Sequence, residues 1–115
     1  MLANLKYIFD FEEKNVEGYP DGHTIDADGN LWVAVFSGSC VLKIDPVRGK
    51  VLDKVPVPAP QVTSVTFGGE NLDILFVTTA RMNYKGIPGP PSGCIFMISG
   101  LNAKGTKGLK YKLDA

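Results

Sequence analysis

Asp21, within the sequence Pro20-Asp21-Gly22, is the residue whose type and setting best suit chemistry. Pro20 fixes its own φ angle and Gly22 leaves the next backbone position free, so the short carboxylate between them can be aimed out of a turn. Such a carboxylate can bind a divalent cation or accept a proton. It can equally accept a hydrogen bond from a nearby backbone N–H and only stabilise a turn. The residues alone leave both interpretations of Asp21 open.

The other reactive residue types form no known catalytic arrangement. His23 is the single histidine, and because the sequence has no Gly-x-Ser-x-Gly elbow we expect no Ser/His/Asp triad. Asp26 and Asp28 resemble the start of a calcium-binding loop, but no Glu follows at the required distance, so we interpret both as turn residues. Arg81 could reach a substrate, although an ion pair is the more ordinary role for it.

The composition argues against several classes of partner. Twelve Lys and Arg balance twelve Asp and Glu, so the chain lacks the positive field that nucleic-acid binders use, and we expect no nucleic-acid partner. No segment approaches the roughly 20 apolar residues of a membrane helix, and the first residues do not resemble a secretory signal, so we expect no membrane partner. Two cysteines are too few for a disulfide scaffold, which favours a cytoplasmic location.

The distribution of glycine and proline predicts an all-β chain. Thirteen Gly and eight Pro fall mainly between short apolar runs. Turn sequences such as Asp28-Gly29-Asn30 separate four consecutive runs, from residue 24 to residue 57, and this spacing predicts an antiparallel meander. Pro56, Pro58 and Pro60 suit the outer end of that meander, since proline cannot donate to a central ladder. The expected strands are residues 6–11, a lone strand, followed by residues 24–27, 31–35, 40–44 and 51–57.

The second half of the chain repeats the first. Val33 and Val77 stand in matching apolar strands 44 residues apart. The third strands of the two units are 54 residues apart because a Gly- and Pro-rich loop, residues 81–92, is inserted before the second of them. Long loops of this kind often lie over a functional site. Thr63 and Ser64 stand at the place that matches Asp21 in the first unit.

The repeat also predicts where several apolar residues lie. Cys40 and Cys94 begin the matching third strands, and we expect both to be buried as small hydrophobic residues. Trp32, Phe67 and Phe76 suit packing between blades. Four lysines near the carboxyl end suit an exposed edge strand formed by residues 109–113, because lysine blocks edge-to-edge pairing. These are Lys104, Lys107, Lys110 and Lys112.

A period of 44 residues with four strands per unit is typical of a β-propeller blade. We expect residues 1–18 to be the outer strand of a preceding blade, residues 19–60 one blade, and residues 61–115 a second blade that contains the inserted loop. The chain holds about 2.6 such units, whereas propellers close with roughly 4–8 blades. We therefore expect about two and a half four-stranded antiparallel blades, with missing amino-terminal blades or self-association needed to cover the open faces.

Five segments resemble the family that includes regucalcin, senescence marker protein, gluconolactonase and the luciferin-regenerating enzyme of insects. The resemblance implies a six-bladed β-propeller, of which this chain would be the carboxyl-terminal portion. It also implies a cytosolic, divalent-metal-dependent lactonase whose partner is a small sugar lactone. The segments that carry the resemblance are residues 19–34, 41–50, 63–69, 76–81 and 93–96.

The resemblance assigns Asp21 as a metal ligand and as a candidate catalytic residue. Asp21 is the one family ligand that maps onto this sequence, and the others would lie upstream of Met1. We expect metal binding first and proton transfer second, because a bound cation stabilises the ionised carboxylate. The ion implied is calcium or zinc, and alternatively magnesium or manganese. Since calcium takes six to eight oxygens, this chain alone should bind it weakly. The alternative function is a non-catalytic calcium-binding or interaction fragment.

Overall fold

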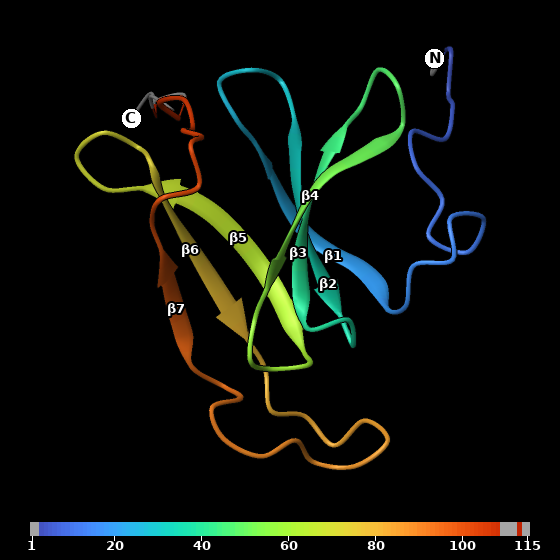
Figure 1. Ribbon diagram of the computed structural model, residues 1–115, viewed down its shortest axis with the longest axis vertical. Coiled ribbons are helices and arrows are strands. Elements are labelled where there is room, and N and C mark those ends of the chain that lie inside the picture. Colours follow the sequence, from blue (N-terminus) through green and yellow to red (C-terminus); the bar gives the residue numbers. More distant parts are fainter. Residues whose placement is uncertain (1–2, 109–112, 114–115) are drawn as a thin grey trace.

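A computed structural model describes residues 3–108 and 113, which form strands, turns and irregular segments. The strands make two antiparallel sheets that pack face to face (Figure 1). The predicted all-β class is confirmed. None of the described residues forms a helix long and apolar enough to cross a membrane. Sheet A consists of β1 (Tyr19–Ile25), β2 (Leu31–Phe36), β3 (Cys40–Asp45) and β4 (Lys50–Pro56), and sheet B of β5 (Val62–Gly68), β6 (Ile74–Thr79) and β7 (Ile95–Ile98).

The predicted four-stranded meander is sheet A, whose spatial order is β1-β2-β3-β4. Its first strand begins earlier than the sequence suggested, at Tyr19 instead of Thr24, because the backbone on both sides of Gly22 pairs with β2. Asp21 therefore lies inside β1 and not in a loop before it. This correction changes how the carboxylate is held.

Asp26 fixes the turn between β1 and β2. Its carboxylate is buried, and Oδ1 accepts hydrogen bonds from the backbone N–H groups of Asp28 (2.9 Å) and Asn30 (3.0 Å). Oδ2 accepts a hydrogen bond from Nε1 of Trp32 at 2.8 Å. The turn role predicted for Asp26 is confirmed, and the same side chain also orients the single tryptophan of the core.

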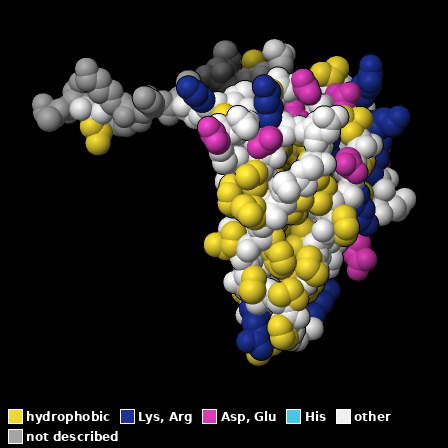
Figure 2. Space-filling model, turned by 60° about the vertical axis from the view of Figure 1, so that its left-hand side comes forward, with side chains coloured by type: hydrophobic (Ala, Val, Ile, Leu, Met, Phe, Trp, Pro, Cys, Tyr) yellow, Lys and Arg dark blue, Asp and Glu magenta, His cyan; other side chains and the backbone are white. Residues whose placement is uncertain are grey.

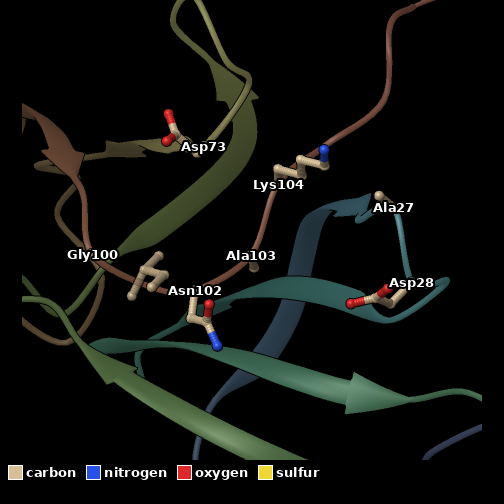
Figure 3. Close-up of a pocket in the computed structure, with 8 residues that line it drawn as sticks. Ala27, Asp28, Asp73, Gly100, Asn102, Ala103 and Lys104 are labelled. Atoms are coloured by element: carbon tan, nitrogen blue, oxygen red, sulfur yellow. The ribbon is translucent and has the colours of Figure 1, made fainter.

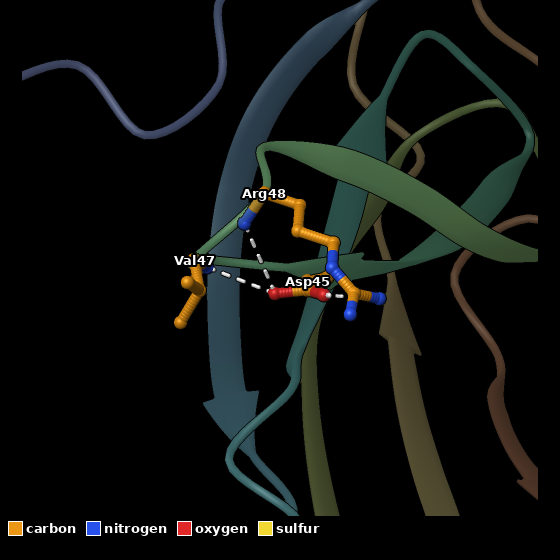
Figure 4. Close-up of polar contacts among 3 residues, drawn as sticks. All are labelled: Asp45, Val47 and Arg48. Carbon is orange, nitrogen blue, oxygen red and sulfur yellow. Dashed lines mark hydrogen bonds and ion pairs between the residues drawn. The ribbon is translucent and has the colours of Figure 1, made fainter.

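A second aspartate holds the turn between β3 and β4. Oδ1 of Asp45 accepts hydrogen bonds from the backbone N–H groups of Val47 (2.9 Å) and Arg48 (3.2 Å), as Figure 4 shows. The Arg48 guanidinium lies 3.8 Å from Oδ2, but its side chain is 77% exposed. Exposed ion pairs of this kind contribute little, so the backbone bonds to Asp45 are the contacts that set the turn.

Apolar side chains of both sheets form the core between them. Trp32 on β2 meets Phe67 on β5 edge to face, with ring centroids 5.5 Å apart, so the packing between units predicted for these two residues is confirmed. Phe76 does not join them. It alternates along β6 with Leu75 and Val77, which face sheet A, and so lies on the opposite face of sheet B. The buried core residues are Trp32, Ala34, Val41, Val55, Val57, Ala59, Val62, Val65, Leu75 and Val77.

The strand predicted for residues 6–11 does not form. Residues 3–18 contain no strand, and the backbone hydrogen bonds near its end are local ones, such as that from the Val16 N–H to the Phe11 carbonyl at 2.8 Å. Phe9, Phe11 and Val16 instead cover the face of sheet A that points away from sheet B. The aromatic pattern of this segment thus reflects side-chain packing, because no neighbouring strand pairs with its backbone.

The two cysteines lie in different environments. Cys40 is buried at the start of β3, as predicted, but Cys94 is exposed just before β7. Within the described residues β7 is the edge of a three-stranded sheet, so nothing covers the start of this strand as β4 covers that of β3. Lys104 and Lys107 are exposed as predicted. The expected edge strand, residues 109–113, lies outside the described residues except for residue 113.

We expect Asp26→Ala to lower the free energy of unfolding by about 3 kcal/mol or more. The change removes the acceptor of three hydrogen bonds, and each bond to a charged group is worth about 1.5–3 kcal/mol. Urea denaturation followed by Trp32 fluorescence, at one fixed chain concentration, measures the effect. Asp28→Ala is the matched control, because Asp28 is exposed in the same turn. Its free energy of unfolding should stay within about 0.5 kcal/mol of that of the parent.

The cysteines predict a difference in thiol reactivity. Burial raises the pKa of the Cys40 thiol, and the nearby Lys54 charge opposes this only in part, so Cys40 stays protonated and shielded. In the native protein Ellman's reagent should modify one thiol per chain rapidly, and both thiols in denaturant. Cys94→Ser should abolish the rapid phase while Cys40→Ser keeps it. Rapid modification of Cys40 would contradict the packing of sheet A.

Candidate functional site

Asp21 lies in a β-bulge. The register of β1 on β2 shifts between Pro20 and His23, so that Asp21 and Gly22 together stand opposite a single residue of β2. A bulge re-aims the side chain that it contains and bends the strand, which is why bulges are frequent beside functional sites. Pro20 is compatible with this place because β1 is an edge strand of sheet A and needs no ladder partner on its free side.

The same bulge occurs in sheet B. The register of β5 on β6 shifts between Val62 and Ser64, so Thr63 and Ser64 occupy in β5 the place that Asp21 and Gly22 occupy in β1. The correspondence predicted from the repeat is confirmed by this strand pairing. One unit therefore presents a carboxylate where the next presents a hydroxyl.

The two bulges abut each other, since β1 and β2 pack against β5. A Cβ atom on Gly22 would lie 2.5 Å from Oγ of Ser64 and 2.9 Å from the carbonyl oxygen of Thr63. Such distances are too short for a real side chain, so the absence of a Cβ allows β1 to approach β5 here. This close approach places Asp21 directly beside the bulge of the second sheet.

The Asp21 carboxylate is exposed, and within residues 3–108 and 113 no hydrogen bond or ion pair occupies it. Asp10, Asp26 and Asp45 differ, because each of them accepts backbone N–H bonds within a turn. Asp21 is thus not one of the aspartates that hold turns. Its oxygens remain accessible to a ligand.

The Thr63 hydroxyl at the second bulge is bonded within sheet B. Oγ1 of Thr63 lies 2.7 Å from Oγ1 of Thr78, which in turn donates to the carbonyl of Ser64 at 3.4 Å. These contacts close the bulge of β5 on itself. Asp21 and Thr63 hold matching positions, and of the two only Asp21 has side-chain oxygens without a hydrogen bond among the described residues.

The remaining candidates do not assemble into a catalytic group. His23 is exposed on β1, and no described hydrogen bond joins it to a serine or an aspartate. Arg81 forms no ion pair with a described residue, contrary to the more ordinary role expected of it. Its Nε donates to the carbonyl of Pro88 at 3.0 Å and so ties the two sides of the inserted loop together.

The inserted loop, residues 81–92, is irregular as predicted and returns toward the beginning of β1 (Figure 1). Buried Gln61 anchors it, because its side-chain amide donates to the carbonyl of Met82 (2.9 Å) and accepts from the Met82 N–H (2.8 Å). The hydroxyls of Tyr84 and Tyr19 lie 3.3 Å apart, and this bond raises the pKa of Tyr84, with desolvation a smaller cause. The loop thus lies at the end of the sheets that carries Asp21.

Gln61, Tyr19 and Tyr84 are residues that the sequence analysis did not single out. An amide or hydroxyl that pairs across 21 or 65 residues leaves no periodic pattern. Together with Lys85 and neighbouring backbone, the two tyrosines line an open cavity of about 300 Å³. A polar residue directly before a buried strand, as Gln61 is before β5, was the one available signal.

A second open cavity of about 380 Å³ lies at the opposite end of the sheets, where β1 ends. Figure 3 shows the segment from Gly100 to Lys104 passing between Asp73 and Asp28. The carbonyl of Lys104 accepts the Ala27 N–H at 2.8 Å, which ties this segment to the β1–β2 turn. Because Asp21 stands near the other end of β1, this cavity is not part of the Asp21 site.

No group of three or more His, Cys, Asp or Glu side chains suited to a metal ion occurs in the described part of the chain. A closed metal cage is therefore not built from these residues alone. What the geometry provides is one free carboxylate on the edge strand β1, beside the bulge of β5.

Residues 1–81 match the model of the SMP-30/gluconolactonase/LRE-like region. The chain belongs to this family. The resemblance inferred from the sequence motifs is confirmed, and the match includes β1, its bulge and Asp21.

Curated relatives extend the match over almost the whole chain. Regucalcin of Danio rerio is 40% identical over 96% of this chain and 38% of its own length, and human regucalcin is 41% identical over 96% and 37%. An uncharacterized protein of Sulfolobus acidocaldarius is 58% identical over 59% of this chain and 25% of its own length. The chain thus spans less than two fifths of the length of these relatives.

Solved structures agree with this assignment. A luciferin-regenerating enzyme superposes with a TM-score of 0.88 at 46% identity, over 96% of this chain and 38% of its own. Regucalcin of Agrobacterium tumefaciens, described as a calcium-binding protein, superposes with a TM-score of 0.81 at 26% identity over 96% and 37%. The two-sheet arrangement is therefore that of the family.

We expect Gly22→Ala to destabilise the protein by about 1–3 kcal/mol, because the added methyl group overpacks the contact between the two bulges. Gly89→Ala is the matched control, since nothing lies within 4 Å of a Cβ at that position. Thermal melts at equal chain concentration measure both changes. Combining Gly22→Ala with Ser64→Gly should recover part of the loss, and full additivity of the two changes would contradict the contact.

Proposed function

We propose that the chain is part of a six-bladed β-propeller that hydrolyses small sugar lactones with a divalent metal ion, and that Asp21 is one ligand of that ion. The observation that carries the proposal is the Asp21 carboxylate, which is exposed, has no hydrogen bond or ion pair among the described residues and is held in a bulge of the edge strand β1. Membership of a family that includes gluconolactonase supports the reaction class.

The repetition of the bulge supports the propeller arrangement. Sheets A and B stack face to face, and their first strands lie side by side with matching bulges. Repeating the rotation that relates sheet A to sheet B would bring one bulge per sheet to a common axis. Each sheet could then contribute one side chain to a central site. In this arrangement residues 19–60 and 61–115 are consecutive blades, and residues 1–18 belong to the blade before them.

A lactone is an internal ester, and its hydrolysis needs a polarised carbonyl group and a nucleophilic water. A bound divalent cation supplies both, as it polarises the carbonyl oxygen and acidifies bound water. Asp21 contributes its carboxylate oxygens, the ligand type that hard divalent cations prefer. Acceptance of a proton from water by Asp21 is the secondary role.

The rest of the site comes from other blades. Calcium takes six to eight oxygens and zinc four ligands, whereas Asp21 supplies two oxygens at most. The relatives are more than twice as long as this chain, so the further ligands and the lactone-contacting residues belong to their remaining length. Calcium or zinc is the proposed ion, with magnesium or manganese as alternatives, and the cytoplasmic location stays a prediction.

Calcium binding without catalysis is the second candidate function. The relative from Agrobacterium tumefaciens is described as a calcium-binding protein, which favours calcium among the candidate ions. In that case Asp21 would hold the ion, but no lactone would be hydrolysed in the completed propeller.

A chimera tests the proposal. This chain, joined to the part of the luciferin-regenerating enzyme that it does not cover, should hydrolyse gluconolactone only when a divalent ion is present. Asp21→Asn in the chimera should lower kcat/KM by about a hundredfold or more, since losing one ligand of a metal site removes the charge that holds the ion. A pH-stat assay with and without chelator measures both effects.

Asp28→Asn is the control, because this carboxylate is exposed in the turn at the other end of β1 and should leave the rate unchanged. A chimera that remains active after Asp21→Asn would remove Asp21 from the mechanism. Calcium binding that depends on Asp21, in a chimera that hydrolyses no lactone, would favour the second function.

A further inference from the structure

The inserted loop brings a tyrosine to the strand that carries Asp21. In sheet A residues 37–39 connect β2 to β3, whereas in sheet B residues 80–94 connect β6 to β7. The longer connection reaches across to the beginning of β1, where the hydroxyls of Tyr84 and Tyr19 lie 3.3 Å apart. The insertion therefore adds to the Asp21 end a side chain that the short turn of sheet A does not supply.

Contacts with other residues hold Tyr84 in place. The side chain of Gln61 bonds the loop backbone twice, at 2.9 and 2.8 Å. The Tyr84 ring meets the ring of Phe36 edge to face, with centroids 5.7 Å apart, and Phe36 pairs with Tyr19 in the β1–β2 ladder. The Lys85 ammonium group lies 5.5 Å from the centroid of the same tyrosine ring. Tyr84 is thus positioned before any ligand arrives, although 38% of it is exposed.

The two tyrosine hydroxyls keep hydrogen-bonding capacity for a ligand. A phenolic hydroxyl can donate one bond and also accept, and neither hydroxyl has another hydrogen bond among the described residues. Their separation of 3.3 Å is longer than the roughly 2.7–2.8 Å of an ordinary O–H···O bond. The pKa of Tyr84 is raised, first by this bond and then by desolvation, so its hydroxyl keeps its proton at neutral pH. A third hydroxyl group can therefore bond to both tyrosines.

The cavity beside the two tyrosines combines aromatic and polar groups. Its volume is about 300 Å³, and Glu17, Ser37 and Lys85 line it together with Tyr19 and Tyr84. The rings offer flat apolar surfaces, while the carboxylate, hydroxyl and ammonium groups offer hydrogen bonds. This combination suits a ring that carries both C–H groups and hydroxyls. Small-molecule pockets are commonly about 300–1,000 Å³, so a ligand of monosaccharide size fits this cavity.

We propose that Tyr19 and Tyr84, here called the hydroxyl site, bind hydroxyl groups of the lactone while the ion held by Asp21 binds its carbonyl group. This inference rests on the proposed function of Asp21. Tyr19 stands two residues before Asp21 on β1, a separation of about 7 Å along a strand. A sugar lactone has hydroxyl groups several ångströms from its carbonyl oxygen, so one molecule can contact both positions. The hydroxyl site thereby selects hydroxylated lactones over plain lactones of the same ring size.

Kinetics of the chimera with the luciferin-regenerating enzyme test this selection. Tyr84→Phe removes one hydroxyl and keeps the ring against Phe36. We expect the KM for gluconolactone to rise about three- to tenfold, as the loss of one hydrogen bond predicts. The kcat should stay the same, because the carbonyl group still meets the ion. δ-Valerolactone has the same lactone ring without hydroxyls, so its KM should not change.

Thr106→Val is the control for these kinetics, because it removes an exposed hydroxyl from the segment after Lys104, at the other end of the sheets. It should leave the KM of both lactones unchanged. An equal rise of both KM values in Tyr84→Phe would show that this hydroxyl only holds the loop, and would overturn the proposal. An unchanged KM for gluconolactone in Tyr84→Phe would overturn it as well.

Ligand binding to the chain itself separates the hydroxyl site from the function of Asp21. The residues that line the cavity all belong to this chain, so the measurement needs no metal ion. The ring polyol myo-inositol, which has no carbonyl group, should give saturation-transfer NMR signals with the parent and with Asp21→Asn. Tyr19→Phe combined with Tyr84→Phe should abolish these signals.

The two proposals can then fail separately. Tyrosine-dependent binding of the polyol, together with a chimera that hydrolyses no lactone, would support the hydroxyl site and refute the proposed function. A chimera that hydrolyses lactones, together with a chain that binds no polyol, would refute the hydroxyl site and leave the role of Asp21 intact.

Discussion

Apolar packing between the two sheets is the interaction on which the rest of the molecule depends. A single sheet of three or four strands leaves both of its faces exposed, and Trp32, Val41, Val62, Leu75 and Val77 become buried because the two sheets stack. Asp26 determines the orientation of one core side chain, because its hydrogen bond to Nε1 of Trp32 fixes the indole ring that contacts Phe67. The stack also determines how β1 and β5, the first strands of the two sheets, lie relative to each other.

The candidate site follows from that relation. Because Gly22 has no side chain, the bulge of β1 can lie against Thr63 and Ser64, and Asp21 is then held at the edge with its oxygens free. The face of sheet B that points away from sheet A is also apolar, and its residues Ile95 and Met97 are exposed (Figure 2). A fold made of repeated sheets is therefore open at its ends until other sheets cover them, and this is why an apolar face of sheet B is exposed.

Several errors of the sequence analysis share a physical origin. Residues 6–11 have the aromatic composition of a strand, but a strand also needs a neighbour for its backbone, and composition does not report that neighbour. Cys94 matches Cys40 in the repeat, yet it is exposed because it begins an edge strand. Each error concerns what lies next to a residue rather than the residue itself.

The sequence by itself determined strands β2, β3 and β4, the turn held by Asp26, the 44-residue repeat and the family, because these depend on neighbouring residues and on periodic patterns. It also identified Asp21 and matched it to Thr63. Only the tertiary structure decided that Asp21 lies in a bulge, that its carboxylate is free, and that Gln61 and Tyr84 bring the inserted loop to the same end. Those features depend on contacts between residues far apart in the chain, and such contacts arise only when the two sheets pack.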